Sequence, residues 1–241
     1  MTTYRIAGDL INNVAAEVGL TPVADPYATS DKSFIQLRYL LDTAGSELLS
    51  VFNWQQLIKE HEIVTADGDS GNYSLPADFG RMIDQSGWDY TGQNPLSGPL
   101  TDAQWKMTQA NNMIGPIYMS FRIAQNQFQV LPQPPDAGKT IKFEYISSNW
   151  VNVEGSGTSY AEKCVQASDV PMFEGILIQK LLKLRWLQAK GFDTTSAVAE
   201  FASQYDAWTG NNRSAPIISL DGKTRPQLLG ILNIPEIGYG S

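Results

Sequence analysis

The sequence predicts an α+β protein in which a helical bundle carries an inserted antiparallel β region and an extended C-terminal tail. Three observations indicate this. Apolar residues recur at helical spacing near the start of the chain and again after residue 168, whereas the middle of the chain alternates between apolar and polar residues. The residues after 210 follow neither pattern. The predicted parts are therefore 1–58 and 168–210 for the bundle, 59–167 for the β-rich domain and 211–241 for the tail.

Two helices are predicted before residue 58. The first is capped by Thr3, stops at Gly19 and carries apolar residues at every fourth position: Ile6, Leu10, Val14 and Val18. The second is capped by Ser30 and extends to Leu57. Its core-facing stripe consists of Phe34, Leu37, Leu41, Ala44, Leu48 and Phe52. A stripe of this length needs a partner helix to bury it, which favours a bundle.

The pattern then changes from helical to alternating. A short strand at Glu62–Thr65 is followed by a turn at 67–71, which contains two glycines, and by a returning strand. Another strand is predicted within 79–90, with Met82 and Trp88 as its inward residues. This region therefore begins the β insert.

Three alternating runs follow between residues 117 and 145, after a short helix capped by Thr101. Turns at Gln125-Asn126 and at 134–138 separate the runs. Met119, Phe121 and Ile123 are expected to share one face. Such alternation is typical of a half-buried antiparallel sheet. A shift of one residue would turn every apolar group to water, so the register is well specified.

Two more helices are predicted after residue 168. Asp169 caps the first of them, with Pro171 in its first turn, and Gly191 ends it. Asp193 caps the second. Both carry apolar residues at helical spacing, so we expect them to complete the bundle that the N-terminal helices begin.

The composition disfavours several classes of function. The chain has 241 residues and a net charge of −8, which argues against a sequence-specific nucleic-acid binder but is compatible with a surface that DNA slides past. Charged residues make up only 17% of the chain, which indicates that much of its surface contacts other protein. The sequence shows no secretion signal and no apolar run long enough to cross a membrane.

The chain contains one cysteine, Cys164, and one histidine, His61. An intrachain disulfide is therefore impossible, and a Ser-His or Cys-His site would have to use this one histidine. No serine or cysteine lies in an activating sequence context. We expect Cys164 to be buried in a strand and His61 to lie on the surface, where a helix gives way to a strand.

Several other charged groups have both a functional and a structural interpretation. A glycosidase pair is conceivable at Asp84 and Asp89 or at Glu60 and Glu62, although the sequence does not give the separation that this chemistry needs. The turn at 67–72 lacks the bidentate glutamate of a calcium loop. One helix face is basic, and we interpret it as a solvated or intersubunit face rather than a DNA patch: Lys180, Lys183, Arg185 and Lys190. We therefore expect no catalytic residue, cofactor or metal site.

Short turn and strand signatures in the middle of the chain are similar to those of a known family. They are Tyr73-Ser74-Leu75-Pro76-Ala77-Asp78-Phe79, Trp105, Gly115-Pro116, Phe121-Arg122, Leu131-Pro132, Pro134-Pro135-Asp136 and Tyr145. With these signatures and its element order, the chain over residues 1–210 resembles the phage head-to-tail adaptor proteins of podovirus-type phages, the tail-tubular-protein-A-like or connector group. None of the signatures is a catalytic motif.

The resemblance implies a structural virion protein and no enzymatic activity. It implies a ring of identical subunits, commonly a dodecamer, between the portal protein and a tail or nozzle protein, with DNA passing through without specific binding. It places the protein in the phage neck, after assembly in the host cytoplasm, and away from membranes. Members of this family often use a C-terminal extension to dock on the portal.

The tail after residue 210 is the strongest candidate for binding a partner. It cannot bury a core of its own, yet it is too apolar for a free linker. We expect it to bind the portal protein or a neighbouring subunit through Ile217, Ile218, Leu220, Arg225, Leu228, Leu229, Ile231 and Ile234. Packing of the tail across its own domain is the alternative.

Two other functions remain open at this point. One is a carbohydrate-binding or hydrolytic tail component, which an open cleft with converging carboxylates would favour. The other is a neck or tail-completion protein at another level of the virion, which the sequence hardly separates from a head-to-tail adaptor. Large flat apolar flanks would favour a ring subunit.

Overall fold

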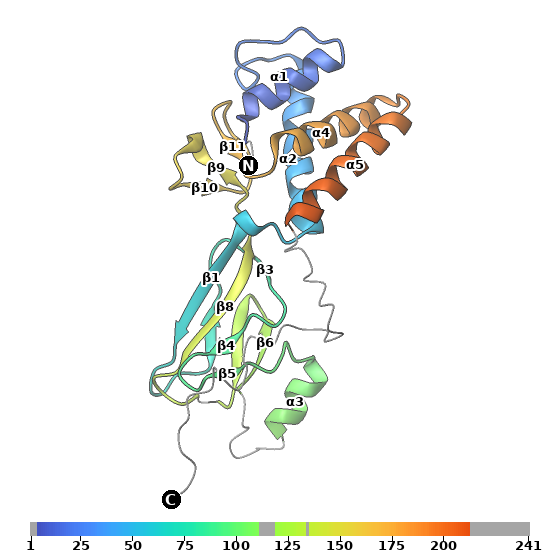
Figure 1. Ribbon diagram of the computed structural model, residues 1–241. Coiled ribbons are helices and arrows are strands. Elements are labelled where there is room, and N and C mark those ends of the chain that lie inside the picture. The colour runs from blue at the N-terminus through green and yellow to red at the C-terminus, as the bar shows by residue number, and fades with distance from the viewer. Residues whose placement is uncertain (1–3, 111–118, 134, 213–241) are drawn as a thin grey trace, which may run out of the picture.

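The computed structural model describes residues 4–110, 119–133 and 135–212. These residues form a helical part and a β part, which are joined end to end at a narrow joint (Figure 1). Five α-helices and several antiparallel sheets lie within the described residues, so the predicted α+β class is confirmed. No helix in these ranges has both the length and the apolar character needed to cross a membrane.

Helices from both ends of the sequence build the helical part. They are α1 (Ala7–Glu17), α2 (Lys32–Val51), α4 (Gly175–Lys190) and α5 (Thr195–Asn212). The central helix is α4, because it packs against each of the other three. The stripe predicted for α2 is buried as expected at Phe34, Leu37, Leu41, Ala44 and Leu48. The two stretches of helical periodicity thus meet in one core.

The starts of the first two helices differ from the prediction. The cap of α2 is Asp31, whose carboxylate accepts a hydrogen bond from the backbone N–H of Ser33 at 2.7 Å, and not Ser30. In α1 the helix begins only after Ile6, which is 39% exposed and does not join the buried face. The predicted cap Thr3 lies outside the described residues.

Asp169 provides the largest correction in the helical part. It does not cap α4, which begins at Gly175, and Pro171 lies in a short strand rather than in a helical turn. Asp169 is buried, and its carboxylate accepts hydrogen bonds from the backbone N–H groups of Glu154, Val165 and Gln166. An acidic residue shortly before a proline can cap a helix or accept hydrogen bonds from the backbone of a loop. The local sequence is the same in both cases, so only the fold distinguishes these two roles.

Two helix ends follow the prediction, whereas α2 ends at Val51 and not at the expected Leu57. Gly19, with φ of 81°, comes directly after the C-cap of α1, and Gly191, with φ of 72°, is the C-cap of α4. These left-handed conformations favour glycine because it has no Cβ. Asp193 accepts a hydrogen bond from the backbone N–H of Thr195 at 3.0 Å, but it lies one residue before Thr194, which occupies the N-cap position of α5.

Two antiparallel sheets make up the β part, and a third lies close to the helical part (Figure 1). The first sheet has the order β1 (Ile58–Val64), β8 (Thr140–Ser147), β4 (Trp88–Asp89) and β5 (Asn94–Pro95), and β3 (Phe79–Met82) also pairs with β8. The second has the order β2 (Asn72–Ser74), β7 (Gln127–Leu131) and β6 (Ser120–Ala124). The third has the order β10 (Tyr160–Ala161), β9 (Val151–Asn152) and β11 (Val170–Pro171).

A stack of aromatic rings forms the core between the first two sheets. The ring of Phe128 stacks on Phe121 at 5.0 Å and on Phe143 at 4.8 Å, measured between ring centroids. Gln125 and Asn126 both have positive φ, as a two-residue hairpin turn requires, which confirms the turn between β6 and β7. The third alternating run, β8, pairs with β1 instead of extending this hairpin.

The first half of the β part needs three further corrections. The first strand starts at Ile58 rather than Glu62, so His61 lies inside a strand, with its ring 5.4 Å from that of Phe143. The strand predicted within 79–90 is divided into β3 and β4. Trp88, expected to face inward, is 44% exposed, whereas its neighbour Asp89 is buried.

The short helix of the β part starts as predicted. In α3 (Asp102–Ala110), Gln104 and Thr101 form a reciprocal cap: the Gln104 side chain accepts from the backbone N–H of Thr101 at 2.9 Å. Trp105 is buried, and the guanidinium of Arg122 lies 4.4 Å from the centre of its ring. This contact fixes α3 to the outer strand of the second sheet.

Candidate assembly surfaces

The eight tail residues predicted to bind a partner all lie after residue 212, outside the described residues. The described part of the chain ends with α5, close to the joint between the two parts (Figure 1). The candidate surfaces among the described residues are therefore the joint, the basic face of α4 and the outer surface of the first sheet.

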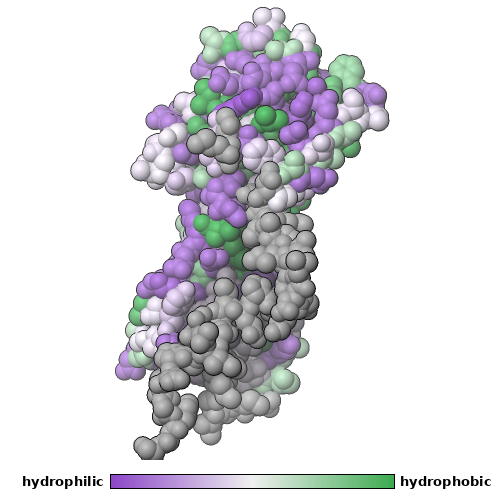
Figure 2. All heavy atoms as spheres, in the orientation of Figure 1, coloured by the Kyte–Doolittle hydropathy of each residue, from purple (hydrophilic) through white to green (hydrophobic). Residues whose placement is uncertain are grey.

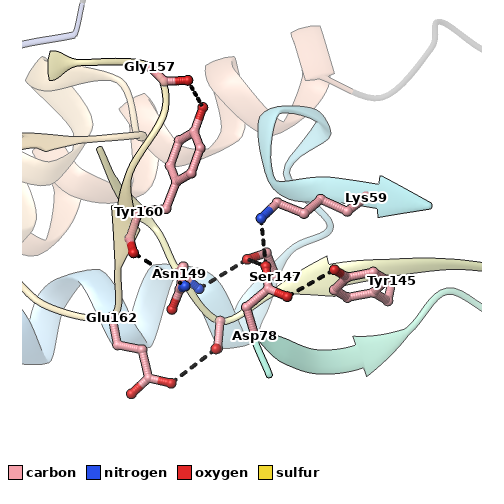
Figure 3. Close-up of polar contacts among 9 residues, drawn as sticks. Lys59, Asp78, Tyr145, Ser147, Asn149, Gly157, Tyr160 and Glu162 are labelled. Atoms are coloured by element: carbon pink, nitrogen blue, oxygen red, sulfur yellow. Dashed lines mark hydrogen bonds and ion pairs between the residues drawn. The ribbon is translucent and has the colours of Figure 1, made fainter. Parts of the chain in front are cut away.

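Asp78 organises the joint on the side of the sheet. Its carboxylate accepts hydrogen bonds from Lys59 Nζ at 2.6 Å, Ser147 Oγ at 2.7 Å and Tyr145 Oη at 2.9 Å (Figure 3). Burial opposes ionisation of this carboxyl, but these three donors outweigh burial and hold its pKa below the usual value. Burial and the bond to Asp78 raise the pKa of Tyr145 to about 12. Asp78 thus ties β1, β3 and β8 together where the sheet meets the helical part.

Arg81 links the sheet to the end of α2. From β3, its guanidinium donates to the backbone carbonyls of Leu49 at 2.8 Å and Phe52 at 2.7 Å, and to the side-chain carbonyl of Asn53. The last turn of α2 has no basic residue of its own, so Arg81 supplies both donors and positive charge to a helix C-terminus. A register shift between Phe79 and Arg81 accompanies this contact.

The basic face of α4 is bound up in contacts within the chain. Lys180 pairs with Glu200 of α5 at 2.6 Å, and Lys183 pairs with Glu17 of α1 at 2.9 Å. Arg185 pairs with Glu47 of α2, and Lys190 lies over the ring of Trp186. Three of these cations therefore connect α4 to its neighbouring helices while staying partly exposed, and the expectation of a solvated or intersubunit face stays a prediction.

The acidic residues considered as a hydrolytic pair have structural partners. Glu60 and Glu62 both bind Lys142, at 3.3 and 2.8 Å. Asp89 accepts hydrogen bonds from two backbone N–H groups of its own turn, whereas Asp84 is exposed. In the turn at 67–72, Asp69 accepts from the backbone of Ala66 and from a tyrosine hydroxyl. Within the described ranges, no three His, Cys, Asp or Glu residues gather in a way that could hold a metal ion.

The environments of the single cysteine and the single histidine do not favour nucleophilic catalysis. Cys164 is buried, as predicted, but in a loop rather than a strand, where its backbone N–H donates to the Asp42 carboxylate at 3.1 Å. Burial raises the pKa of its thiol, which disfavours the reactive thiolate. Burial also lowers the pKa of His61, whose ring contacts Phe143. The two side chains belong to different cores, and the structure does not bring them together as a pair.

The fold defines a two-part protein in which the described polar contacts join structural elements to one another. This is the class of structural proteins, and the comparison with known families is consistent with it. The family model described as SU10 adaptor protein matches residues 2–217, and the chain therefore belongs to this family of phage head-to-tail adaptor proteins. The matched region includes both parts of the fold and only the first of the predicted tail residues, Ile217. No curated protein matches the chain.

Proposed function

We propose that this protein is a structural, non-enzymatic subunit of the phage neck, which forms a ring between the portal protein and the tail or nozzle protein. Identical copies surround a central passage for DNA, as a dodecamer or a ring of similar size. The chain assembles with its partners in the host cytoplasm and then remains in the virion.

The observation that carries this proposal is the locked joint in a member of the adaptor family. A ring that connects two different neighbours needs subunits whose two ends keep a fixed relative orientation. Arg81 provides this link, because it joins β3 to the end of α2 across the boundary of two cores, and Asp78 ties together the strands of the sheet that meet there. Helices α2 and α4 would form the wall of the ring. Head-to-tail contacts close into a ring when each subunit has two complementary faces.

The charge distribution supports passage of DNA without binding. The net charge of −8 repels phosphate, and the cations of α4 have partners inside the chain. An acidic lining would therefore let DNA move along the axis instead of holding it.

The tail is the proposed docking element of this ring. We assign binding of the portal or of a neighbouring subunit to Ile217, Ile218, Leu220, Arg225, Leu228, Leu229, Ile231 and Ile234. The four-part division at residues 58, 167 and 210 belongs to the same proposal, with the β part facing the tail or a neighbour.

The test is the mass of the purified protein alone and after mixing with the portal of the same phage, measured by light scattering or native mass spectrometry. We expect a ring to form on the portal. A chain truncated after Asn212 should lose this association, while an Asp84→Lys variant, altered at an exposed site in the β3–β4 turn, should retain it. Absence of any complex with the full chain would overturn the proposal, and cleavage of a glycan by the protein would favour the hydrolytic alternative.

A further inference from the structure

One edge of the first sheet is long and open. The strand β1 has seven residues, and among the described residues its only sheet partner is β8. The opposite end of the sheet, β5, has two residues and contains Pro95, which blunts an edge. In the second sheet, the β6 edge is covered by backbone bonds from Ser97 and Leu100. Open edges of this length invite pairing with another strand, so β1 is the sheet edge best suited to a partner.

The residues of β1 that present backbone groups to this open edge can be identified. Thr65 N–H donates to Lys139, on the β8 side. Backbone groups alternate in direction along a strand, so those of Glu60, Glu62 and Val64 face away from β8. The opposite strand agrees, because the carbonyls of Thr140 and Glu144, which pair with Val64 and Glu60, accept bonds from Tyr90 and Ile83 on the other side of β8.

The same stretch of β1 has an unbalanced negative charge. Glu60 lies directly opposite Glu144, which places two carboxylates in a close cross-strand position. Among the described residues, Lys142 is the cation that binds Glu60 and Glu62, and it is shared between them. The margin of the β part along which β1 runs is largely hydrophilic (Figures 1 and 2). A partner strand with cations at alternate positions would complement this edge in both backbone and charge.

The tail contains a segment of this kind, Lys223-Thr224-Arg225, followed by Pro226. The two cations are two residues apart and would share one face of a strand. In an antiparallel register with Arg225 opposite Glu60 and Lys223 opposite Glu62, their backbone groups face β1. Pro226 then turns its missing N–H away from β1, so it costs no bond and blunts the new edge.

We infer that residues 223–225 of a second copy of this chain add to β1 as an antiparallel strand, and that this contact joins neighbouring subunits of the ring. The inference rests on the ring proposed above. It commits to a second copy because a closed ring needs two different complementary faces on each subunit, and the open β1 edge and a strand supplied by the tail are two such faces.

Disulfide trapping between full-length chains tests the pairing. Two variants are prepared in a Cys164→Ala background, one with Glu62→Cys and the other with Lys223→Cys, and they are mixed with the portal and oxidised. Directly opposed residues of a hydrogen-bonded antiparallel pair have a spacing that a disulfide spans. We expect a covalent dimer containing one copy of each variant. A chain with both cysteines that gives only an internally linked monomer would overturn the assignment to a second copy.

Charge exchange tests the register. Glu60→Lys with Glu62→Lys in one chain, or Lys223→Glu with Arg225→Glu, should each reduce the affinity of ring assembly on the order of tenfold, because two cross-strand ion pairs become repulsive. The chain carrying all four changes should recover. Asp84→Lys is the matched control, because its exposed carboxylate lies away from the β1 edge. Equal loss in the control, or no recovery, would contradict the pairing.

A proline substitution separates backbone pairing from simple charge attraction. Val64→Pro removes an N–H that faces the open edge, so the fold of the subunit should be retained, as circular dichroism would show, while trapping is lost. Ile63→Pro removes a bond to β8 and should unfold the sheet instead. If rings form on the portal and all of these variants behave like the parent chain, the strand exchange is wrong and the adaptor function stands. If the parent chain itself forms no ring, the proposed function fails first.

Discussion

The helical part and the β part of this protein differ in how they pair their charged side chains and their exposed edges. In the helical part, the cations of α4 have partners on α1, α2 and α5, and the apolar stripe of α2 is buried. In the β part, an edge strand of seven residues pairs on one side only among the described residues, and Glu60 faces another carboxylate. The cations of α4 are therefore satisfied within the helical part, whereas the β1 edge has binding capacity left over.

This difference indicates a division of work. A closed bundle keeps its shape when neighbours bind or leave, and an open sheet edge offers directional bonds to a neighbour. Arg81 connects the two parts at the joint. The predictions below test how far the two parts are independent.

The largest expected effect comes from Trp150, which follows β8 in the chain and is buried in the core of the helical part. Its side chain is 1% exposed, and its ring lies so close to α2 that a Cβ on Gly45 would come within 2.3 Å of it. Trp150→Ala should lower the free energy of unfolding by about 3–5 kcal/mol, measured by chemical denaturation. The control is Trp88→Ala, at 44% exposure, with a loss below about 1 kcal/mol. Equal losses in the two variants would show that the helical core does not depend on the segment after β8.

The second effect comes from Arg81, which joins the parts by hydrogen bonds. Arg81→Met removes the donors to Leu49, Phe52 and Asn53 and should cost about 2–3 kcal/mol. It should also separate unfolding into two transitions, because each part retains its own core. Calorimetry measures both quantities. The matched control is Arg122→Met, which removes a guanidinium within the β part and should leave a single transition.

The third effect is a dependence on pH at Asp78. Because the folded-state pKa of Asp78 is lowered, the stability it contributes is present above the ordinary carboxyl pKa and is lost as the pH falls through the folded value. Asp78→Asn should cost about 1–2 kcal/mol at neutral pH. The melting temperatures of parent and variant should converge as the solution is acidified below about pH 4. A difference that stays constant down to the acid limit would mean that Asp78 acts through shape and not through charge.

Sequence reasoning reached the parts of this fold that local patterns control. The stripe of α2, the stop at Gly191 and the turn at Gln125-Asn126 each depend on neighbouring residues, and all three predictions are confirmed. Arg81 was missed because its partners Leu49 and Phe52 come from a distant segment, and no short window contains both members of such a contact. Asp169 was assigned wrongly for another reason: it binds the backbone N–H groups of Val165 and Gln166 just before it, but an acidic residue two positions before a proline is also typical of a helix cap.

The two halves of the candidate binding site also differ in whether local sequence reveals them. The apolar character of the tail is visible in the sequence, so the eight tail residues could be predicted there. The open side of β1 could not, because it depends on β8 pairing with β1 rather than with the β6–β7 hairpin that precedes it. Strand order is decided by burial of Phe143 and Ile141 in the common core, which is a property of the whole β part.

The smallest expected effect concerns the surface of the helical part. Lys180→Ala removes an ion pair with Glu200 that is partly exposed, so the loss should be about 0.5 kcal/mol or less and should vanish at high salt. Glu60→Ala provides the comparison in the β part, since it removes one of two facing carboxylates and should leave stability unchanged or slightly higher. Thermal melts at low and high salt measure both. A larger loss of stability for Glu60→Ala than for Lys180→Ala would reverse the comparison. It would mean that the charges of the β1 edge are already satisfied within the chain, so the edge would not need a partner strand.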